Sequence, residues 1–320
     1  MAGSATVKIT AKAATITVTN ASKTYGESDP AFTGTVEGLV SATDLGTISY
    51  VRTNATVNNV GTYDDVLTAS YTANSNYAVT VVPGDFEITA KTATITVADA
   101  SKTYGATDPT FTGTVEGLVS ASDLGTISYS RTGSDENVGT YDDVLTAEYT
   151  PNSNYSVTVV PGDFTINPAS MSITVNGSNT SKVYNGSLQN YTGTVTATST
   201  TEGFDDSKFS YSGSTTVSGT NVGEYTMALA AASCAYNDNN YTVAWTIGDP
   251  VKLIITPATT EVTATGYEQA YDGVAHSITV TAPSGATVTY STDGTNYSSE
   301  NPSYSDVGNY TVYYKVVKDN

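Results

Sequence analysis

A four-residue motif recurs four times along the chain and constrains the fold more than any other feature. It has the pattern Val-Gly-x-Tyr and ends at Tyr63, Tyr141, Tyr225 and Tyr310. A Tyr-Gly or Tyr-x-Gly motif precedes each copy, beginning at Tyr25, Tyr104, Tyr184 and Tyr271, which gives repeat periods of 79, 80 and 87 residues. Periods this long indicate whole domains in tandem, because the coils of a solenoid are much shorter.

Each repeat is predicted to consist of short strands, so the fold class is all-β. Apolar residues alternate with polar ones in segments such as 14–18 and 93–97, which places the apolar side chains on one face of a strand. The chain is rich in Thr, Ser, Val and Asn, and 24 Tyr stand against a single Trp. Pro83-Gly84 and Pro161-Gly162 interrupt the last apolar run of their repeats, which predicts a bend or bulge there.

About seven short strands in each repeat of roughly 80 residues are typical of an immunoglobulin-like sandwich. In such domains an Asp-x-Gly-x-Tyr segment places a tyrosine at the corner before the sixth strand, where its hydroxyl bonds to the backbone. Residues 306–310 fit this pattern fully, and the other three repeats carry Asn59, Asn137 and Asn221 at the Asp position. The motif therefore predicts a tyrosine corner in every repeat.

The repeats divide the chain into four domains in an elongated array, the last one incomplete. We expect a tag remnant and the closing strand of a preceding repeat in 1–12, repeat 1 in 13–90, repeat 2 in 91–168, a divergent repeat 3 in 169–258, and repeat 4, lacking its last strand, in 259–320. No Gly/Ser-rich linker separates them, so neighbouring domains should keep a narrow range of angles.

Both ends of the chain are out of phase with the repeat. Residues 5–12 match the closing half-strand at 86–91, and repeat 4 stops level with the Asn-Tyr motif at Lys318, Asp319 and Asn320. Excision from a longer array is the favoured explanation. The alternative is that the N-terminal strand of one molecule completes the open domain of the next.

The repeats resemble a known family through specific motifs. These are Tyr25-Gly26-Glu27 and Tyr104-Gly105-Ala106, each preceded by a lysine, with Gly84-Asp85-Phe86 and Gly162-Asp163-Phe164. They resemble the MBG domains of bacterial surface proteins, and Tyr271-Asp272-Gly273 is similar to their YDG relatives. The resemblance implies tandem Ig-like modules, MBG-type in repeats 1 and 2 and YDG-type in repeat 4, in an adhesin at the bacterial cell surface, outside the cell.

Composition restricts the partners. The net charge of -19, from 31 acidic and 12 basic residues, repels phosphate and anionic lipid, so we expect no nucleic-acid partner and no membrane insertion. No window of eighteen apolar residues occurs. Host glycan or host protein remains as a partner class, and we expect a monomer, with head-to-tail assembly as the alternative.

Residues suited to catalysis are scarce. His276 is the only histidine and Cys234 the only cysteine, and they lie in different repeats, so we expect no enzyme and no intramolecular disulfide. We also expect no cofactor. Calcium is the alternative, because oxygen ligands cluster at 237–240 and 293–296, although ordinary Asx turns explain both clusters.

One candidate for covalent chemistry is an intramolecular Lys-Asn isopeptide bond. In repeat 1 it would join Lys23 to Asn76 with Asp65 as proton shuttle, and in repeat 2 it would use the equivalent set Lys102, Asp143 and Asn154. Such a bond requires a buried, neutral lysine beside a protonated acid. The simpler interpretation is that a bulge turns Asp65 and Asp143 outward and that both lysines reach solvent.

The sequence therefore predicts a non-catalytic stalk that presents a distal binding region. A rival from another class is a module that itself binds host glycan or protein, placed in repeat 3 with Trp245. A third interpretation is a self-assembling fibre subunit built by strand complementation.

Overall fold

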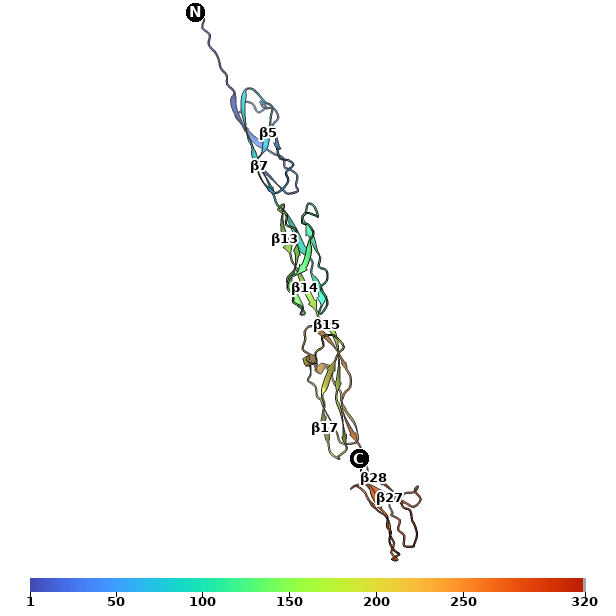
Figure 1. Cartoon of the computed structure of the whole chain (residues 1–320). Helices are drawn as coiled ribbons and strands as arrows, with labels where there is room; N and C mark the ends of the chain where they lie inside the picture. Colours follow the sequence, from blue (N-terminus) through green and yellow to red (C-terminus); the bar gives the residue numbers. More distant parts are fainter. Residues whose placement is uncertain (319–320) are drawn as a thin grey trace. The chain divides into compact units, whose positions relative to one another are not determined.

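The computed structural model describes residues 1–318, and it is all-β as predicted (Figure 1). The chain divides into two compact units, Met1–Ala169 and Ser170–Asn320. Each unit is built from strands, and residues 170–318 add two single-turn 3-10 helices, η1 (Asp206–Lys208) and η2 (Ala231–Ser233). No helix among residues 1–318 has the length and apolar character needed to cross a membrane.

Residues 12–89 form a two-sheet sandwich. One sheet has the order β3-β1-β6 and the other β2-β7-β5-β4. The strands are β1 (Lys12–Val18), β2 (Ala21–Thr24), β3 (Gly34–Glu37), β4 (Ser49–Arg52), β5 (Gly61–Ser70), β6 (Tyr77–Val82) and β7 (Gly84–Thr89). Because β1 and β2 run parallel to β6 and β7, the entering and leaving strands of the domain lie side by side.

Residues 91–167 repeat this sandwich. The sheets have the orders β10-β8-β13 and β11-β12-β14-β9. The strands are β8 (Lys91–Val97), β9 (Ala100–Thr103), β10 (Gly113–Glu116), β11 (Ser128–Arg131), β12 (Gly139–Glu148), β13 (Tyr155–Val160) and β14 (Gly162–Asn167). Only Ala90 separates β7 from β8, so the two sandwiches follow one another without a linker.

The predicted alternation fills the cores. In β1 the side chains of Ile16 and Val18 point inward and are buried, and in β7 those of Phe86 and Ile88 do the same. The bend predicted at Pro83 is the point where the chain leaves one sheet for the other: β6 ends at Val82 beside β1, and β7 begins at Gly84 between β2 and β5. A proline suits this position because it has no N–H to give to either ladder.

The bulge predicted at the paired aspartates is also present. The register between β5 and β7 shifts between Tyr63 and Leu67, and Asp65 adopts a φ of 56° with its side chain exposed. Asp143 has the same φ in β12. Asp tolerates this left-handed conformation better than most residues, and it lets Tyr63 and Leu67 both face the core.

A tyrosine corner closes three of the four repeats. The hydroxyl of Tyr63 donates to the carbonyl of Asn59 at 2.7 Å, and Tyr141 makes the equivalent bond to Asn137 at 2.8 Å. Tyr225 bonds to the carbonyl of Asn221 at 3.0 Å. These bonds fix the corner at which β5, β12 and β21 begin.

The first part of the second unit is a more divided sandwich. Its sheets have the orders β18-β15-β23 and β16-β24-β21, with the pairs β17-β20 and β19-β22 beside them. The strands are β15 (Ala169–Gly177), β16 (Asn179–Val183), β17 (Gln189–Thr192), β18 (Val195–Thr198), β19 (Phe209–Tyr211), β20 (Thr216–Gly219), β21 (Gly223–Met227), β22 (Cys234–Tyr236), β23 (Tyr241–Ile247) and β24 (Val251–Thr256).

The rest of the described chain forms two antiparallel pairs: β25 (Thr263–Thr265) with β26 (Thr279–Thr281), and β27 (Thr287–Ser291) with β28 (Tyr313–Val317). The tyrosine corner predicted at residues 306–310 is not formed there. Instead the ring of Tyr310 stacks on that of Tyr304, with centroids 3.9 Å apart and an interplanar angle of 5°. The last two residues of the predicted fourth repeat, Asp319 and Asn320, lie outside the described residues. The division into four domains remains a prediction.

Candidate functional site

Buried basic side chains mark one end of the first sandwich. Lys23 on β2 and Arg52 on β4 are buried, with side-chain exposures of 6% and 1%, although we expected Lys23 to reach solvent. The guanidinium of Arg52 lies over the ring of Phe86, 4.6 Å from its centroid. The aromatic ring supplies an apolar surface against which the guanidinium packs.

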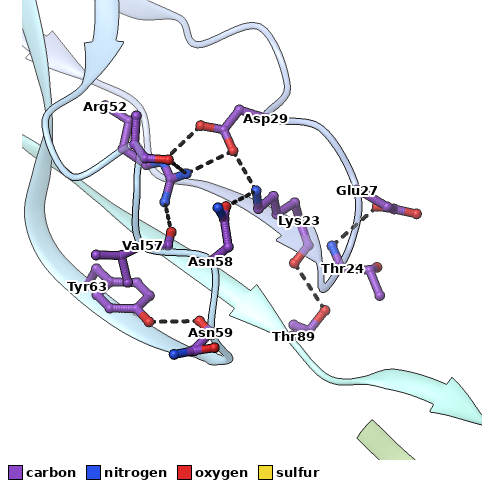
Figure 2. A network of polar contacts seen from close by, with 11 residues as sticks. Lys23, Thr24, Glu27, Asp29, Arg52, Val57, Asn58, Asn59, Tyr63 and Thr89 are labelled. Carbon is purple, nitrogen blue, oxygen red and sulfur yellow. Dashed lines mark hydrogen bonds and ion pairs between the residues drawn. The ribbon is translucent and has the colours of Figure 1, made fainter. Parts of the chain in front are cut away.

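A single carboxylate joins the two cations, as Figure 2 shows. Asp29 accepts from Lys23 Nζ at 2.8 Å, and both of its oxygens accept from Arg52, at 2.8 Å from Nε and 3.1 Å from Nη2. Lys23 Nζ also donates to Asn58 Oδ1 at 2.9 Å. Burial alone would raise the pKa of Asp29, but the hydrogen bonds from Lys23 and Arg52 outweigh it and hold that pKa below its usual value.

The cluster ties two loops to the sheet. Asp29 belongs to the segment after β2, and Asn58 belongs to the segment between β4 and β5. Arg52 Nη1 donates to the carbonyl of Val57 at 2.8 Å, and Nη2 donates to that of Ala55 at 3.3 Å. Loop carbonyls are thereby satisfied by a buried guanidinium, so the loop ending in the tyrosine corner is held in one position.

The second sandwich has the same cluster with a different charge. Lys102 is buried and Arg131 nearly so, with side-chain exposures of 4% and 9%, and Arg131 Cζ lies 4.7 Å from the ring centroid of Phe164. They share two acids: Asp108 accepts from Lys102 Nζ at 2.7 Å, and Glu136 pairs with both cations. These contacts lower the pKa of Glu136, through Lys102 first and Arg131 second. Hydrogen bonds from the amine to Asp108 and Glu136 raise the pKa of Lys102.

The structure does not bring together the residues of the isopeptide hypothesis. Lys23 contacts Asp29 and Asn58, whereas Asp65 lies on the exposed bulge and its N–H donates to Asp85 Oδ1 at 3.0 Å. Asn76 is exposed, and its backbone N–H donates to Asn74 Oδ1 at 3.0 Å. The acid that does lie beside Lys23 is Asp29. Its lowered pKa keeps it ionised, so it cannot serve as the protonated acid that the bond requires.

The second isopeptide set is separated in the same way. Lys102 is buried, against our expectation that it reaches solvent, but its partners are Asp108 and Glu136. Asp143 lies on its bulge, where its N–H donates to Asp163 Oδ1 at 2.9 Å. Asn154 is part of a different contact, with residues of the preceding sandwich.

That contact joins the two sandwiches of the first unit. The N–H of Val60 donates to Asn154 Oδ1 at 2.9 Å, and Asn154 Nδ2 donates to Asn59 Oδ1 at 3.3 Å. Tyr25 meets Tyr155 edge to face, with centroids 5.4 Å apart. The partners on the first sandwich are therefore neighbours of the buried cluster, because Tyr25 follows β2 and Asn59 follows Asn58.

Tyr155 is the centre of this joint. Its ring is 7% exposed, and its hydroxyl accepts from the N–H of Val119 at 2.8 Å while donating to Asp123. Burial first, and the contact with Asp123 second, raise its pKa. A Cβ on Gly26 would lie only 2.4 Å from Val119 Cγ2, and the φ of +82° at this glycine also excludes most side chains.

The cluster residues Asp29, Arg52, Asn58, Asp108, Arg131 and Glu136 were not predicted from the sequence. A signal for them is present, because Arg52 and Arg131 are the only arginines of the chain and occupy equivalent places in repeats 1 and 2. Asp29 and Asp108 likewise each precede a proline in those two repeats. The recurrence of a rare residue type at equivalent positions is the sequence signal that indicates these clusters.

The segments considered for calcium are occupied by internal contacts. Asp293 accepts from the backbone N–H groups of Asn296 and Thr295, each at 2.8 Å, and these bonds hold its pKa far below the usual value. Asp238 pairs with Lys208 at 2.8 Å. Among residues 1–318 no group of three His, Cys, Asp or Glu side chains is placed to hold a metal ion. His276 stacks on Tyr267 at 3.6 Å and pairs with Asp272.

Two sheets of a sandwich, with a tyrosine corner at the start of the fifth strand (β5 or β12), define an immunoglobulin-like domain in residues 12–89 and again in 91–167. A family model described as "MBG domain (YGX type)" matches residues 14–87 and 93–165. These two stretches are therefore tandem MBG domains, as the sequence motifs predicted. The matched residues do not include Tyr271-Asp272-Gly273, so the YDG resemblance remains a prediction.

No curated protein matches the chain. Among solved structures, it is similar to the crystal structure of Down Syndrome Cell Adhesion Molecule (DSCAM) isoform 1.30.30, N-terminal eight Ig domains, with 12% identity and a TM-score of 0.17. The alignment covers 89% of this chain and 47% of that one. At this TM-score the likeness supports no argument about function.

Proposed function

We propose that the chain is a non-catalytic stalk segment of a bacterial cell-surface adhesin, which presents a binding region carried elsewhere. The observation that carries this proposal is the joint between the two MBG domains. Asn154 bonds to both Val60 and Asn59, and Tyr25 packs on Tyr155, while a single residue separates β7 from β8. A joint of this kind restricts the angle between neighbouring domains, whereas a flexible linker would not.

The strand order supports a role under tension. Residues 12–17 of β1 pair in parallel with residues 77–82 of β6, and β8 pairs with β13 in the same way. Pulling the two ends of such a domain apart loads the hydrogen bonds of a parallel ladder together, in shear. Bonds loaded together resist more force than bonds opened one after another. A stalk on a surface exposed to flow would need this property.

Force spectroscopy on the whole chain tests the proposal with a matched control. Handles attached through cysteines at Ala13 and Val82 pull the ladder in shear, and handles at Ala13 and Ala78 open the same ladder from one end, since these two residues are register partners. We expect a several-fold higher unfolding force in the first geometry. Equal forces in the two geometries would contradict the proposal.

A module that binds host glycan or protein directly is the rival function. The sequence suggests Trp245 in the divergent third repeat as its site. This residue lies on β23 and is partly buried against the core, where its ring lies 6.0 Å from that of Phe209, centroid to centroid. A partly buried indole packed in this way offers less of its face to a sugar than an exposed one. Binding by this chain on a glycan array, abolished by a single surface substitution, would favour the rival over the stalk.

A further inference from the structure

An asparagine followed by a glycine is open to a covalent change that needs no enzyme. The chain contains two such pairs, Asn176-Gly177 and Asn185-Gly186, and a serine follows each of them. Glycine favours the change because it has no Cβ to keep the side chain of the asparagine away from its amide nitrogen. Since the same residues follow both asparagines, a difference in their reactivity has to come from the structure.

The first pair is held in a sheet. Asn176 and Gly177 end β15, where they pair with Thr196 and Val195 of β18. The N–H of Gly177 donates to the carbonyl of Asp249 at 2.7 Å, and Asn176 Oδ1 accepts from the N–H of Asp249 at 2.9 Å. A Cβ on Gly177 would lie 2.4 Å from the nearest backbone atom. The nitrogen of this glycine therefore cannot turn toward the preceding side chain without breaking the strand.

The second pair lies on an exposed loop. Residues 184–188 connect β16 to β17, and Asn185, Gly186 and Ser187 are all exposed. Among residues 1–318 the N–H of Gly186 has no hydrogen-bond acceptor. Apart from the chain neighbours of this glycine, no atom lies within 4 Å of the position of a Cβ on it. Its nitrogen is therefore accessible to a base in the solvent and free to approach the side chain of Asn185.

One hydrogen bond prepares the side chain of Asn185 for attack. Its Oδ1 accepts from the N–H of Ser187 at 3.0 Å, which folds the side-chain carbonyl back over the intervening peptide. If the nitrogen of Gly186 attacks Cγ, negative charge develops on Oδ1, and a donor that already points at this atom stabilises the charge. Asn176 Oδ1 also has a donor, but the nitrogen that would attack there is bound in the strand.

We propose that Asn185 is a site of spontaneous deamidation through a cyclic succinimide. The nitrogen of Gly186 loses its proton to a base in the solvent and forms a bond to Cγ of Asn185. The bond from Cγ to the side-chain nitrogen breaks, and this nitrogen takes up a proton and leaves as ammonia. Water then opens the ring: attack at the side-chain carbonyl gives aspartate, and attack at the main-chain carbonyl gives isoaspartate. Overall one water is consumed and one ammonia is released.

Another turn of the chain already carries the acid that this reaction produces. In Tyr271-Asp272-Gly273 an aspartate stands where the motif at Tyr184 has Asn185. Asp272 Oδ1 accepts from the N–H of Val274 at 2.9 Å, two residues further on, as Asn185 Oδ1 accepts from the N–H of Ser187. The same turn therefore accommodates an amide or a carboxylate, so the aspartate product fits the loop.

The change should stay local because both ends of the loop are anchored. The N–H of Tyr184 donates to the carbonyl of Thr256 at 2.9 Å. At the other end Gln189 is 8% exposed, and its Nε2 donates to the carbonyl of Val183 at 3.1 Å. We therefore expect the aspartate form to keep the fold while it adds one negative charge to the net charge of -19.

Peptide mass spectrometry of the aged whole chain tests the proposal, because trypsin separates the two asparagines. Cleavage after Lys182 places Asn176 in the peptide 132–182 and Asn185 in the peptide 183–208. Exchange of an amide for an acid raises the mass of a peptide by about 1 Da, and fragmentation of the peptide locates the change. After incubation of the folded chain at mildly alkaline pH, we expect this gain at Asn185 to be several-fold faster than at Asn176.

Two controls separate the effect of the structure from that of the local sequence. In denaturant both asparagines are followed by the same flexible residues, so they should change at equal rates. The variant Asn185→Gln should show no gain at this position, because ring closure would need a less favourable six-membered ring, and its exposure leaves the fold intact. Equal rates in the folded chain, an unchanged Asn185, or a difference that persists in denaturant would overturn the proposal.

Discussion

The ion clusters of the two MBG domains share the same two kinds of cation but differ in the number of acids that pair with them. Both bury a lysine and an arginine beside a phenylalanine, but Asp29 is the only acid in the first cluster, and Asn58 takes the place that Glu136 has in the second. Two cations and one acid leave the first cluster with a net charge of +1, and two acids make the second neutral. The first cluster depends on a single carboxylate. In the second, Glu136 pairs with both cations in addition to Asp108.

The difference shows which part of the arrangement is required. The lysine, the arginine and the aspartate recur, whereas the fourth position accepts either an amide or a carboxylate. The fourth residue lies on the exposed loop, where an ion pair contributes less than one between buried side chains. The aspartate satisfies two buried cations, so its removal leaves charge without a partner.

The largest expected effect follows from removing that acid. Asp29→Asn should destabilise the first domain by about 3 kcal/mol, because Lys23 and Arg52 lose their only carboxylate. Asp108→Asn is the matched control and should cost clearly less, since Glu136 still pairs with both cations. Hydrogen exchange of peptides from β7 and β14 reports the two domains separately. Equal losses would show that the clusters do not differ in this way.

A smaller effect is expected at the turn that links the first cluster to the joint. Gly26→Ala should destabilise the first domain by about 1–2 kcal/mol through its positive φ, and should also displace Val119. Gly105→Ala has nearly the same φ, but no described atom lies within 4 Å of its Cβ position. Only the first substitution should increase exchange of the Val119 amide. The same increase in both variants would mean that the joint is not sensitive to this contact.

Exchanging the fourth residues should produce a smaller change of opposite sign in the two domains. Asn58→Glu supplies a second acid to the first cluster and should stabilise it, and Glu136→Asn should destabilise the second. Thermal unfolding, monitored separately for each domain through its own peptides, would measure both changes in stability. The double exchange should leave the sum nearly unchanged, and a net loss would indicate that the loops, not the charges, set the preference.

The smallest expected effect is a difference in the onset of acid sensitivity. Asp29 and Glu136 both have lowered pKa values in the folded chain, so their contributions are present above the unfolded values and are lost as the pH falls through the folded ones. Because the ordinary values are 3.8 and 4.5, the loss should begin at a higher pH in the second domain. Hydrogen exchange rates measured from about pH 6 to about pH 3, an interval that includes both ordinary pKa values, would show which domain loses stability first. The reverse order would contradict it.

The sequence predicted the fold because its strongest signals are local. Alternation fixes the inward face of β1 and β7, Pro83 marks the change of sheet, and the Val-Gly-x-Tyr motif marks the tyrosine corner. The bulge at Asp65 followed from the same pattern, because a charge on an inward face requires a break in the register. Each of these inferences needs only neighbouring residues.

The site was harder to predict because its contacts connect distant parts of the chain. Asp29 meets Arg52 across 23 residues, and Asn154 meets Val60 across 94. Nothing local distinguishes Asn154 from Asn76, which holds the same place in its own repeat and is exposed. The tyrosine corner predicted at Tyr310 was wrong, because the ring of this residue stacks on that of Tyr304, a contact that the local motif does not indicate.

The fixed joint between the two MBG domains is the central claim, and a distance distribution tests it most directly. In a Cys234→Ala background, spin labels at Thr80 and Thr158, two exposed and equivalent positions, would report the separation of the domains by pulsed electron resonance. We predict one narrow distribution that broadens with Asn154→Ala and not with Asn76→Ala. A broad distribution in the unaltered chain would contradict the claim that this joint sets the orientation of neighbouring domains.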